Sequence, residues 1–314
     1  MSFGSESTTD EVLAGRDLSG QWVLVTGASA GLGQETARAV AARGANVVLA
    51  VRDVEKGERA AEPVRAAASE LGATVELRAV DLASLASVRA FTDELRAAHD
   101  RLDVIVANAG VMATPEGRTA DGFEMQFGTN HLGHFVLVNR LRPLLASPGR
   151  IVNLSSAGHR FSPVVLDDVN FDRTPYDAWQ AYGRSKTANI LFSVELDRRG
   201  RGAGQRACAV HPGTVVTELG RHLTDETLGA LAAARSGQET VWKTPAVGAA
   251  TTVWSGFVAG PDEIGGRYCE DCHVAEATSD PNRSGGVRDY ALDPETAARL
   301  WARSEELVGE AFAS

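Results

Sequence analysis

From residue 22 onward, the chain alternates short apolar runs with longer amphipathic stretches. The apolar runs cover residues 22–26, 46–51, 75–80, 103–108, 150–154 and 205–211. Stretches with helical periodicity lie between them, at residues 36–43, 55–70, 85–98, 122–145 and 179–198. Runs that are apolar at nearly every position, rather than at every second one, are typical of parallel strands buried on both faces. The pattern therefore predicts parallel strands connected by helices.

This alternation predicts an α/β fold: a single doubly wound parallel sheet, or Rossmann fold, with helices on both faces. The sequence contains no internal repeat and no linker-like change in composition, so we expect residues 21–314 to form a single domain. Residues 1–20 are rich in Ser, Thr and Gly and carry little hydrophobic pattern. They are expected to form a flexible N-terminal arm, with a short helix around residues 11–15.

Three segments are expected to form the substrate loops. Residues 157–178 contain Pro163, Pro175 and several acidic residues, and residues 260–294 are rich in Gly, Pro and Asp. Long loops in compact domains are often functional. We expect both segments, together with residues 214–240, to lie above the carboxyl ends of the strands, where α/β proteins bind ligands.

Composition and charge narrow the classes of function. Of the 314 residues, 44% are hydrophobic and 23% are charged, which is typical of a globular protein with a full core. The formal net charge of −10 argues against a nucleic-acid partner, because phosphate contacts need clustered Lys and Arg. No apolar run approaches the roughly 20 residues of a membrane span. The polar first residues do not resemble a secretory signal, so a cytoplasmic location is expected.

A glycine-rich turn follows the first predicted strand and precedes a helix, at residues 26–33. Glycines there let the backbone turn tightly and approach a pyrophosphate, which the free N–H groups of the helix would bind. A plain strand-to-helix turn is the alternative, but the strand and helix on either side are the context that a dinucleotide site requires. The predicted cofactor contacts in this turn are Gly27, Ser29, Ala30, Gly31, Leu32 and Gly33.

Arg52 and Asp53 end the second predicted strand, about 20 residues beyond the glycines, where a dinucleotide fold reads the adenosine ribose. A carboxylate would bind the free 2′-hydroxyl, whereas Arg52 would attract a 2′-phosphate. We favour NADP(H) over NAD(H), with Arg52 as the reader. In the alternative, Arg52 is a solvated loop charge and Asp53 binds the ribose.

The next two strand ends supply further candidate cofactor contacts. Asp81, followed by Leu82, ends the third strand, where its carboxylate could accept a hydrogen bond from the adenine amino group or cap the next helix. The fourth strand ends in Asn108, Ala109 and Gly110, whose small size would let the nicotinamide ribose lie against the backbone.

Tyr182 and Lys186 are four residues apart on the predicted helix at 179–198, and therefore share a face. A free phenol has a pKa of about 10, and a nearby cation lowers it. We therefore expect Lys186 to lower the pKa of Tyr182. Tyr182 would donate a proton to a carbonyl oxygen in reduction and remove a hydroxyl proton in oxidation.

These elements together resemble the short-chain dehydrogenase/reductase family over roughly residues 20–270, and within it most closely the retinol-dehydrogenase-like group. The resemblance rests on the order of the motifs Thr26-Gly-x-x-x-Gly31-x-Gly33, Asp81, Asn108-Ala-Gly110, Asn130, Ser155-Ser156, Tyr182-x-x-x-Lys186 and Pro212-Gly213. The group is indicated by Arg52-Asp53, by residues 130–135, 150–156 and 211–217, and by the long spacer between the serines and Tyr182.

The resemblance implies roles for several residues. Tyr182 and Lys186 would also contact the cofactor, Lys186 through the nicotinamide ribose. Family alignment favours Ser156 over Ser155 as the hydroxyl that orients the substrate oxygen. Asn130 matches the family residue that holds a proton-relaying water, and its alternative is a helix-interior amide bonded to nearby backbone.

The turn after the sixth predicted strand is expected to cover the nicotinamide. The resemblance places its backbone near the carboxamide and a hydroxyl near the diphosphate. The residues concerned are Pro212, Gly213, Val215 and Thr217. The alternative is that Pro212 and Gly213 are simple turn residues.

Cys269, Cys272 and His273 have the spacing of half a zinc site or a haem attachment. The sequence has no second Cys pair to complete a zinc site, and only three cysteines in all. We therefore expect no metal and a structural strand-and-loop role for residues 267–273.

The sequence as a whole predicts an NADP(H)-dependent oxidoreductase that interconverts a hydrophobic alcohol and its ketone or aldehyde, with Tyr182 as general acid and base. One alternative is the same fold using NAD(H) on a sterol-, polyketide- or sugar-like substrate. The other is a non-catalytic protein that senses dinucleotides or acts as a scaffold. The expected partner is a small-molecule substrate, and the family resemblance implies a homodimer through the helices near Gly122 and Trp179.

Overall fold

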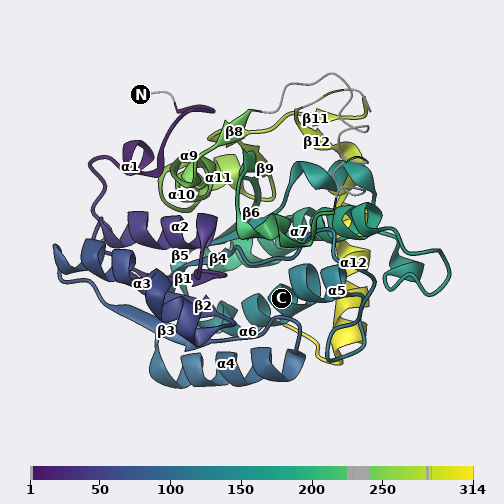
Figure 1. The fold of residues 1–314 in the computed structure, drawn as a ribbon, viewed down its shortest axis with the longest axis horizontal. Helices are drawn as coiled ribbons and strands as arrows, with labels where there is room; N and C mark the ends of the chain where they lie inside the picture. The colour runs from purple at the N-terminus through teal and green to yellow at the C-terminus, as the bar shows by residue number, and fades with distance from the viewer. Residues whose placement is uncertain (1–2, 225–228, 230–240, 281–282, 284, 314) are drawn as a thin grey trace.

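An eight-stranded sheet lies at the centre of the computed structural model, which describes residues 3–224, 229, 241–280, 283 and 285–313 (Figure 1). Across the sheet the order is β10 (His273–Val274), β9 (Tyr268–Glu270), β6 (Gln205–His211), β5 (Leu145–Leu154), β4 (Leu102–Ala107), β1 (Trp22–Thr26), β2 (Asn46–Val51) and β3 (Val75–Ala79). All neighbouring strands are parallel except β9 and β10. The predicted α/β class and doubly wound parallel sheet are confirmed, with an antiparallel edge strand added.

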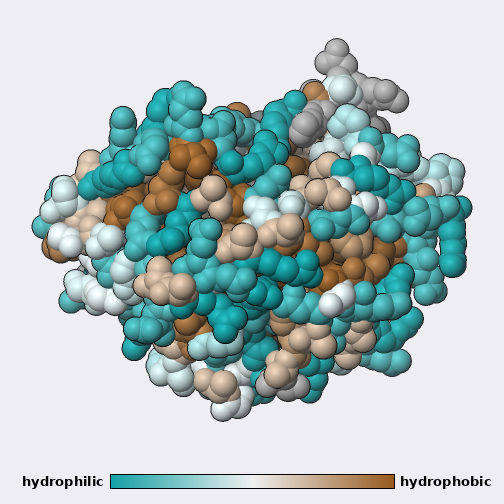
Figure 2. Space-filling view, turned by 90° about the horizontal axis from the view of Figure 1, so that it is seen from below, coloured by the Kyte–Doolittle hydropathy of each residue, from teal (hydrophilic) through white to brown (hydrophobic). Residues whose placement is uncertain are grey.

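Helices cover both faces of the sheet (Figure 1). One face carries α2 (Gly31–Ala41) and α3 (Val54–Ser69), and the other carries α4 (Leu85–Ala98), α6 (Gly133–Leu141) and α7 (Ala178–Gly200). Successive strand residues point to opposite faces, so Val23 and Val25 pack in the first layer while Leu24 packs in the second. This burial on both sides explains the continuous apolar runs. Seen from below, the surface is mainly hydrophilic, with hydrophobic residues in separate patches (Figure 2).

The stretch predicted as one helix at 122–145 is interrupted. It forms α5 (Met125–Phe127), a π-helical turn η1 (Gly128–Leu132), α6 and a 3₁₀ turn η2 (Arg142–Leu144). Gly133 begins α6 at a place where a side chain has no room, since a Cβ there would lie 2.4 Å from the carbonyl oxygen of Leu82. The π turn contains Asn130, and such turns are frequent at functional sites.

Residues 8–18 pack against the domain, whereas the sequence predicted a flexible arm over residues 1–20. The helix α1 (Thr9–Val12) begins with a capping box between Thr8 and Glu11. Val12, Leu13 and Leu18 are buried in the same layer as α2 and α3. A few apolar side chains are enough to hold this segment, although they do not form a periodic pattern that the sequence would reveal.

The C-terminal helix α12 (Pro294–Val308), drawn in yellow, was not anticipated from the sequence (Figure 1). Its Trp301 is buried against Phe135 of α6 and Phe192 of α7. The Arg199 guanidinium lies 4.2 Å from the centre of the Trp301 ring. This helix covers part of the surface of α6 and α7, the helices through which a homodimer was expected. A second chain could reach the covered surface only if α12 moved.

Short elements complete the fold. They are β7 (Thr214–Val215), η6 (Glu218–His222), β8 (Trp242–Lys243), α9 (Pro245–Gly248), α10 (Ala250–Val253), η7 (Trp254–Val258), α11 (Pro261–Ile264), β11 (Ala277–Thr278), β12 (Val287–Arg288) and η8 (Asp289–Ala291), with η3 (Ala157–Phe161), η4 (Leu166–Asp168) and η5 (Arg201–Ala203) earlier in the chain. Residues 260–294, predicted as a loop, therefore contain four of the strands. Parts of the expected substrate loops, residues 225–228, 230–240, 281–282 and 284, lie outside the described residues. Within the described part of the chain, no helix has the length and apolar composition needed to cross a membrane.

Candidate active site

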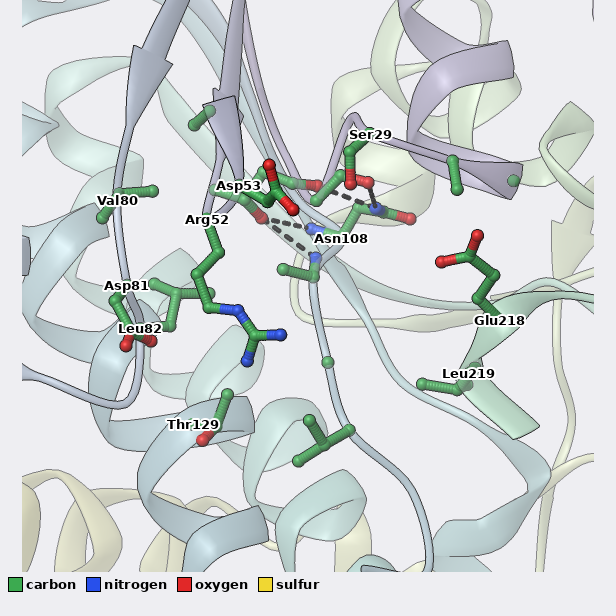
Figure 3. A pocket seen from close by; sticks show the side chains of 18 of the residues that line it. Ser29, Arg52, Asp53, Val80, Asp81, Leu82, Asn108, Thr129, Glu218 and Leu219 are labelled. Atoms are coloured by element: carbon green, nitrogen blue, oxygen red, sulfur yellow. Dashed lines mark hydrogen bonds between the residues drawn. The ribbon is translucent and has the colours of Figure 1, made fainter. Parts of the chain in front are cut away.

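A cleft of about 380 Å³ runs along the carboxyl ends of β1, β2, β3 and β4 (Figure 3). Most of the residues predicted to bind the cofactor line it: Gly27, Ser29, Ala30, Gly31, Leu32, Arg52, Asp81, Leu82, Asn108, Ala109, Gly110 and Thr217. The other predicted residues lie outside its lining: Gly33, Tyr182, Lys186, Pro212, Gly213 and Val215. The sequence did not single out further lining residues, among them Lys56, Thr129, Glu218 and Arg221.

The glycine turn is locked against the end of β4. Gly27 has a φ of 67°, and a Cβ there would lie 2.8 Å from the Cα of Ala109. Asn108 donates from Nδ2 to the Thr26 carbonyl oxygen at 2.7 Å. A Cβ at Gly33 would lie 2.5 Å from both the Gly27 oxygen and Asn108 Nδ2. Gly33 therefore supports the turn from behind, which explains why it does not line the cleft.

A buried hydrogen-bond chain connects this turn to the π-helical turn. Thr26 Oγ1 accepts from the backbone N–H groups of Asn108 and Ala109, at 2.9 and 3.0 Å, and lies 2.9 Å from His134 Nε2. His134 Nδ1 lies 3.0 Å from the Asn130 carbonyl oxygen. Burial lowers the pKa of His134 to about 4, so the ring is neutral. The consistent assignment has Nδ1–H donating to Asn130 while the Thr26 hydroxyl donates to Nε2.

At the adenosine end of the cleft, Arg52 and Asp53 have different contacts. Asp53 caps α3, where its Oδ1 accepts from the Lys56 N–H at 3.0 Å. Asp53 and Arg52 both line the cleft, and the Arg52 guanidinium extends into it (Figure 3). At the next strand end, Asp81 Oδ1 accepts from the Ala83 N–H at 2.9 Å, and the N-cap of α4 is Ser84 rather than Asp81.

Tyr182 and Lys186 lie on α7 and are both 3% exposed. Lys186 Nζ donates to the Leu154 carbonyl oxygen at 3.0 Å and lies 5.7 Å from the centre of the Tyr182 ring. A Cβ built on Gly110 would lie 3.5 Å from Nζ, so the ammonium group adjoins the cleft. The pair therefore sits at the end of the cleft next to the β4 strand end.

The prediction that Lys186 lowers the pKa of Tyr182 is wrong for this structure. Burial raises the pKa of Tyr182 to about 12, and the hydrogen bond with Ser156 only partly opposes this. Burial also lowers the pKa of Lys186 to about 8. Removal of both groups from water outweighs their proximity, so the phenol holds its proton at neutral pH.

The two serines at the end of β5 have different partners. The Ser156 hydroxyl hydrogen-bonds Tyr182 and also accepts from the Gly158 N–H at 3.0 Å. The Ser155 hydroxyl donates to the backbone oxygen of Lys186 at 2.9 Å. A Cβ at Gly158 would lie 2.5 Å from Tyr182 Cε1, so glycine makes room for the ring. The geometry brings Ser156, and not Ser155, to the phenol.

Asn130 makes hydrogen bonds to both sides of the site. Its Oδ1 accepts from the Val111 N–H at 2.8 Å, and its Nδ2 donates to the Val111 oxygen and to Ser185 Oγ, each at 2.9 Å. The side chain is thus bonded to backbone and to Ser185, and the role of Asn130 in holding a proton-relaying water stays a prediction. These contacts hold the chain after β4 against α7, next to Lys186.

His159 is a residue near the site that the sequence analysis missed. Its Nδ1 lies 2.7 Å from the Ser156 carbonyl oxygen, and its Nε2 accepts from the Arg288 N–H at 3.1 Å. Burial lowers its pKa to about 3, so it is neutral. It connects Ser156 to β12. Its position three residues after Ser156 was the only available signal.

The turn after β6 lies beside the glycine turn. A Cβ at Gly31 would lie 3.1 Å from Thr217 Cγ2, which places Thr217 at the start of α2. Gly213 has a φ of 82°, and the Lys243 side chain lies against it.

The Cys269–His273 motif lies at the β9–β10 edge of the sheet. Cys269 is buried on β9 and hydrogen-bonds Cys208 of β6, and Cys272 is buried beside Thr251. Among the described residues, no group of three or more His, Cys, Asp or Glu is arranged to hold a metal ion.

Comparisons with known proteins extend these observations. A family model described as short chain dehydrogenase matches residues 21–228. The chain is 39% identical to human "Retinol dehydrogenase 13" over 302 residues, which cover 92% of this chain and 85% of the relative. A crystal structure of an uncharacterized protein from Mycobacterium paratuberculosis aligns with a TM-score of 0.71 and 35% identity, covering 96% of this chain and 98% of that one. The Pseudomonas aeruginosa RhlG/NADP complex aligns with a TM-score of 0.62 and 28% identity, covering 81% and 95%.

Proposed function

Because the chain belongs to the short-chain dehydrogenase/reductase family, as an oxidoreductase acting on CH–OH and C=O groups, we propose that it uses NADP(H) to interconvert a hydrophobic alcohol and its ketone or aldehyde. The observation that carries the proposal is the buried Tyr182–Ser156 pair, with Lys186 Nζ next to Gly110 at the end of the cleft. An aldehyde, ketone and quinone screen with NADPH and NADH side by side tests it.

The cleft fits a dinucleotide. The glycine turn at the start of α2 suits the diphosphate, and Gly110 beside Lys186 suits the nicotinamide ribose. A bound nicotinamide supplies or accepts the hydride at the substrate carbon. In reduction, Tyr182 donates its proton to the substrate oxygen, which the Ser156 hydroxyl orients. In oxidation, the same phenol oxygen accepts the hydroxyl proton.

Aromatic side chains support a hydrophobic substrate. The rings of Trp179 and Tyr182 lie 6.3 Å apart, centre to centre, and Phe161 lies 5.5 Å from Trp179. An apolar alcohol reaching Tyr182 would contact these rings and bury its surface there. The name of the human relative points to the same class of alcohol.

Substitution of Arg52 by Ala tests the cofactor preference. We expect the Kd for NADPH to rise roughly tenfold or more, because a charge-assisted contact with the 2′-phosphate is lost, while the Kd for NADH barely changes. Fluorescence titration of both cofactors measures this. Arg59→Ala is the matched control, since Arg59 lies one turn or more along α3 and pairs with the exposed Glu55. Equal binding of both cofactors, with no effect of Arg52→Ala, would disprove the preference.

Paired serine variants test which hydroxyl orients the substrate. Ser156→Ala should lower kcat by roughly 10²–10³, the usual effect of removing a donor to the reacting oxygen. Ser155→Ala should leave kcat within about tenfold and lower the stability by roughly 1 kcal/mol, because it removes a buried hydrogen bond to α7. Steady-state kinetics and thermal unfolding of both variants distinguish these roles, and the reverse pattern would assign the substrate to Ser155.

A further inference from the structure

Lys56 and Glu218 join two sides of the cleft that are far apart in the fold. Lys56 lies in the first turn of α3, after β2, and Glu218 begins η6, after β6 and β7. Lys56 Nζ forms an ion pair with Glu218 Oε2, and both residues line the cleft. Since β1, β4 and β5 lie between β2 and β6 in the sheet, the pair bridges the cleft at the level of the glycine turn.

The pair and Arg52 line the same cleft. Figure 3 shows Arg52 reaching into the cleft from one side and Glu218 facing the cleft from the other. Asp53, which lies between Arg52 and Lys56 in sequence, is held by the N–H of Lys56 as the helix cap. Arg52, Asp53 and Lys56 therefore all line the cleft at the end proposed for the adenosine.

The ion pair can exchange partners readily. The side chains of Lys56 and Glu218 are 33% and 57% exposed, and exposed ion pairs contribute little to stability. The lysine ammonium is a compact charge on a flexible stem, so it can turn from one anion to another without moving the helix. A phosphate dianion is a stronger partner than a single solvated carboxylate.

We propose that Lys56 is a second specificity-determining residue for the 2′-phosphate of NADP(H), held by Glu218 while the cleft is empty. The inference rests on the proposed use of NADP(H). When the 2′-phosphate arrives, Lys56 leaves Glu218 and pairs with the phosphate beside Arg52. NAD(H) offers no such partner, so Lys56 strengthens the binding of NADP(H) alone, and Glu218 lowers only that affinity by competing for Lys56.

A double-mutant cycle tests the exchange. Dissociation constants for NADPH, NADH, 2′,5′-ADP and 5′-ADP are measured at low salt for the wild type, Lys56→Met, Glu218→Gln and the double variant. Lys56→Met should weaken NADPH and 2′,5′-ADP roughly tenfold and leave NADH and 5′-ADP unchanged. Glu218→Gln should tighten NADPH about threefold, and this gain should vanish in the Lys56→Met background.

A control variant and three distinct outcomes separate failure of this proposal from failure of the proposed function. Glu55→Gln removes a carboxylate charge, as Glu218→Gln does, but from an 87% exposed side chain of α3 outside the cleft, and should change no constant. If Glu218→Gln raises the affinity for NADPH equally with and without Lys56, then Glu218 acts only by repelling the anionic cofactor. That result would overturn the proposal. Equal wild-type constants for NADPH and NADH would contradict the proposed function itself. A wild-type preference for NADPH that Lys56→Met leaves intact would contradict only the assignment of Lys56.

Discussion

Tyr182→Phe should abolish turnover while preserving cofactor binding. The phenol is buried and hydrogen-bonds Ser156, so it is the group positioned to exchange a proton with the substrate oxygen. Loss of a general acid and base typically lowers the rate by about 10²–10⁴. The hydroxyl does not line the cleft, and the Kd for NADPH should therefore stay within about twofold. Steady-state kinetics and fluorescence titration on the same preparation measure both quantities.

The pH dependence of turnover tests the role of the Tyr182 hydroxyl independently. Because burial raises the pKa of Tyr182 to about 12, the phenol is protonated across the neutral range. Reduction, which needs the proton, should be nearly independent of pH from about 6 to 7, below the lowered pKa of Lys186. Oxidation needs the phenolate, whose fraction rises about tenfold per pH unit below the pKa, so kcat for oxidation should rise with pH.

The Phe variant also provides the control for this pH profile. It should lose the rise of oxidation with pH, because the titrating hydroxyl is gone. Substantial residual turnover with an unchanged pH profile would show that another group transfers the proton, and the assignment of Tyr182 would then be wrong.

Gly33→Ala should destabilise the protein and weaken cofactor binding, against the expectation from helix propensity. Alanine is the better helix former by about 1 kcal/mol. At this position, however, the new Cβ would lie 2.5 Å from the Gly27 oxygen and from Asn108 Nδ2. Relieving the overlap must move the glycine turn or the β4 strand end, at a cost of about 1–3 kcal/mol. Since both border the cleft, we expect the Kd for the cofactor to rise at least tenfold, or about 1.4 kcal/mol.

A second glycine gives the matched control for this substitution. Gly202 lies in the 3₁₀ turn η5, and a Cβ there would meet nothing within 4 Å. Gly202→Ala should therefore leave both the melting temperature and the cofactor Kd unchanged or slightly improved. If Gly33→Ala behaves in the same way, the close approach behind the turn does not constrain the site.

Local sequence was sufficient for the framework of the site. The apolar runs located β1, β2 and β6 at their observed bounds, because strands buried on both faces need apolar residues at nearly every position. The glycine turn and the Tyr182–Lys186 spacing were also readable, since each depends on residues close together in the chain. The break in the helix at Asn130 was not readable, because residues 126–139 are all buried, so no polar face marks the register of the helix.

Contacts between residues far apart in the sequence decided the features of the site and fold that local sequence did not reveal. The choice between Ser155 and Ser156 depends on which hydroxyl reaches α7 and which reaches the phenol. The direction of the Tyr182 pKa depends on burial, which no spacing reveals, and the sequence prediction was wrong for that reason. The packing of α12 over α6 and α7 likewise arises from side chains more than 100 positions apart.

The sequence by itself therefore determined the class of fold, the glycine turn and the position of Tyr182 and Lys186 on one helix face, because these follow from local periodicity and spacing. Only the tertiary structure decided the neutral histidines that link Thr26 to Asn130 and Ser156 to β12, and the pairing of Lys56 with Glu218. Hydrogen bonds and ion pairs of this kind depend on distances that only the folded chain sets. Their partners are separated by as many as 162 positions, and nothing in the local pattern of either partner identifies the other.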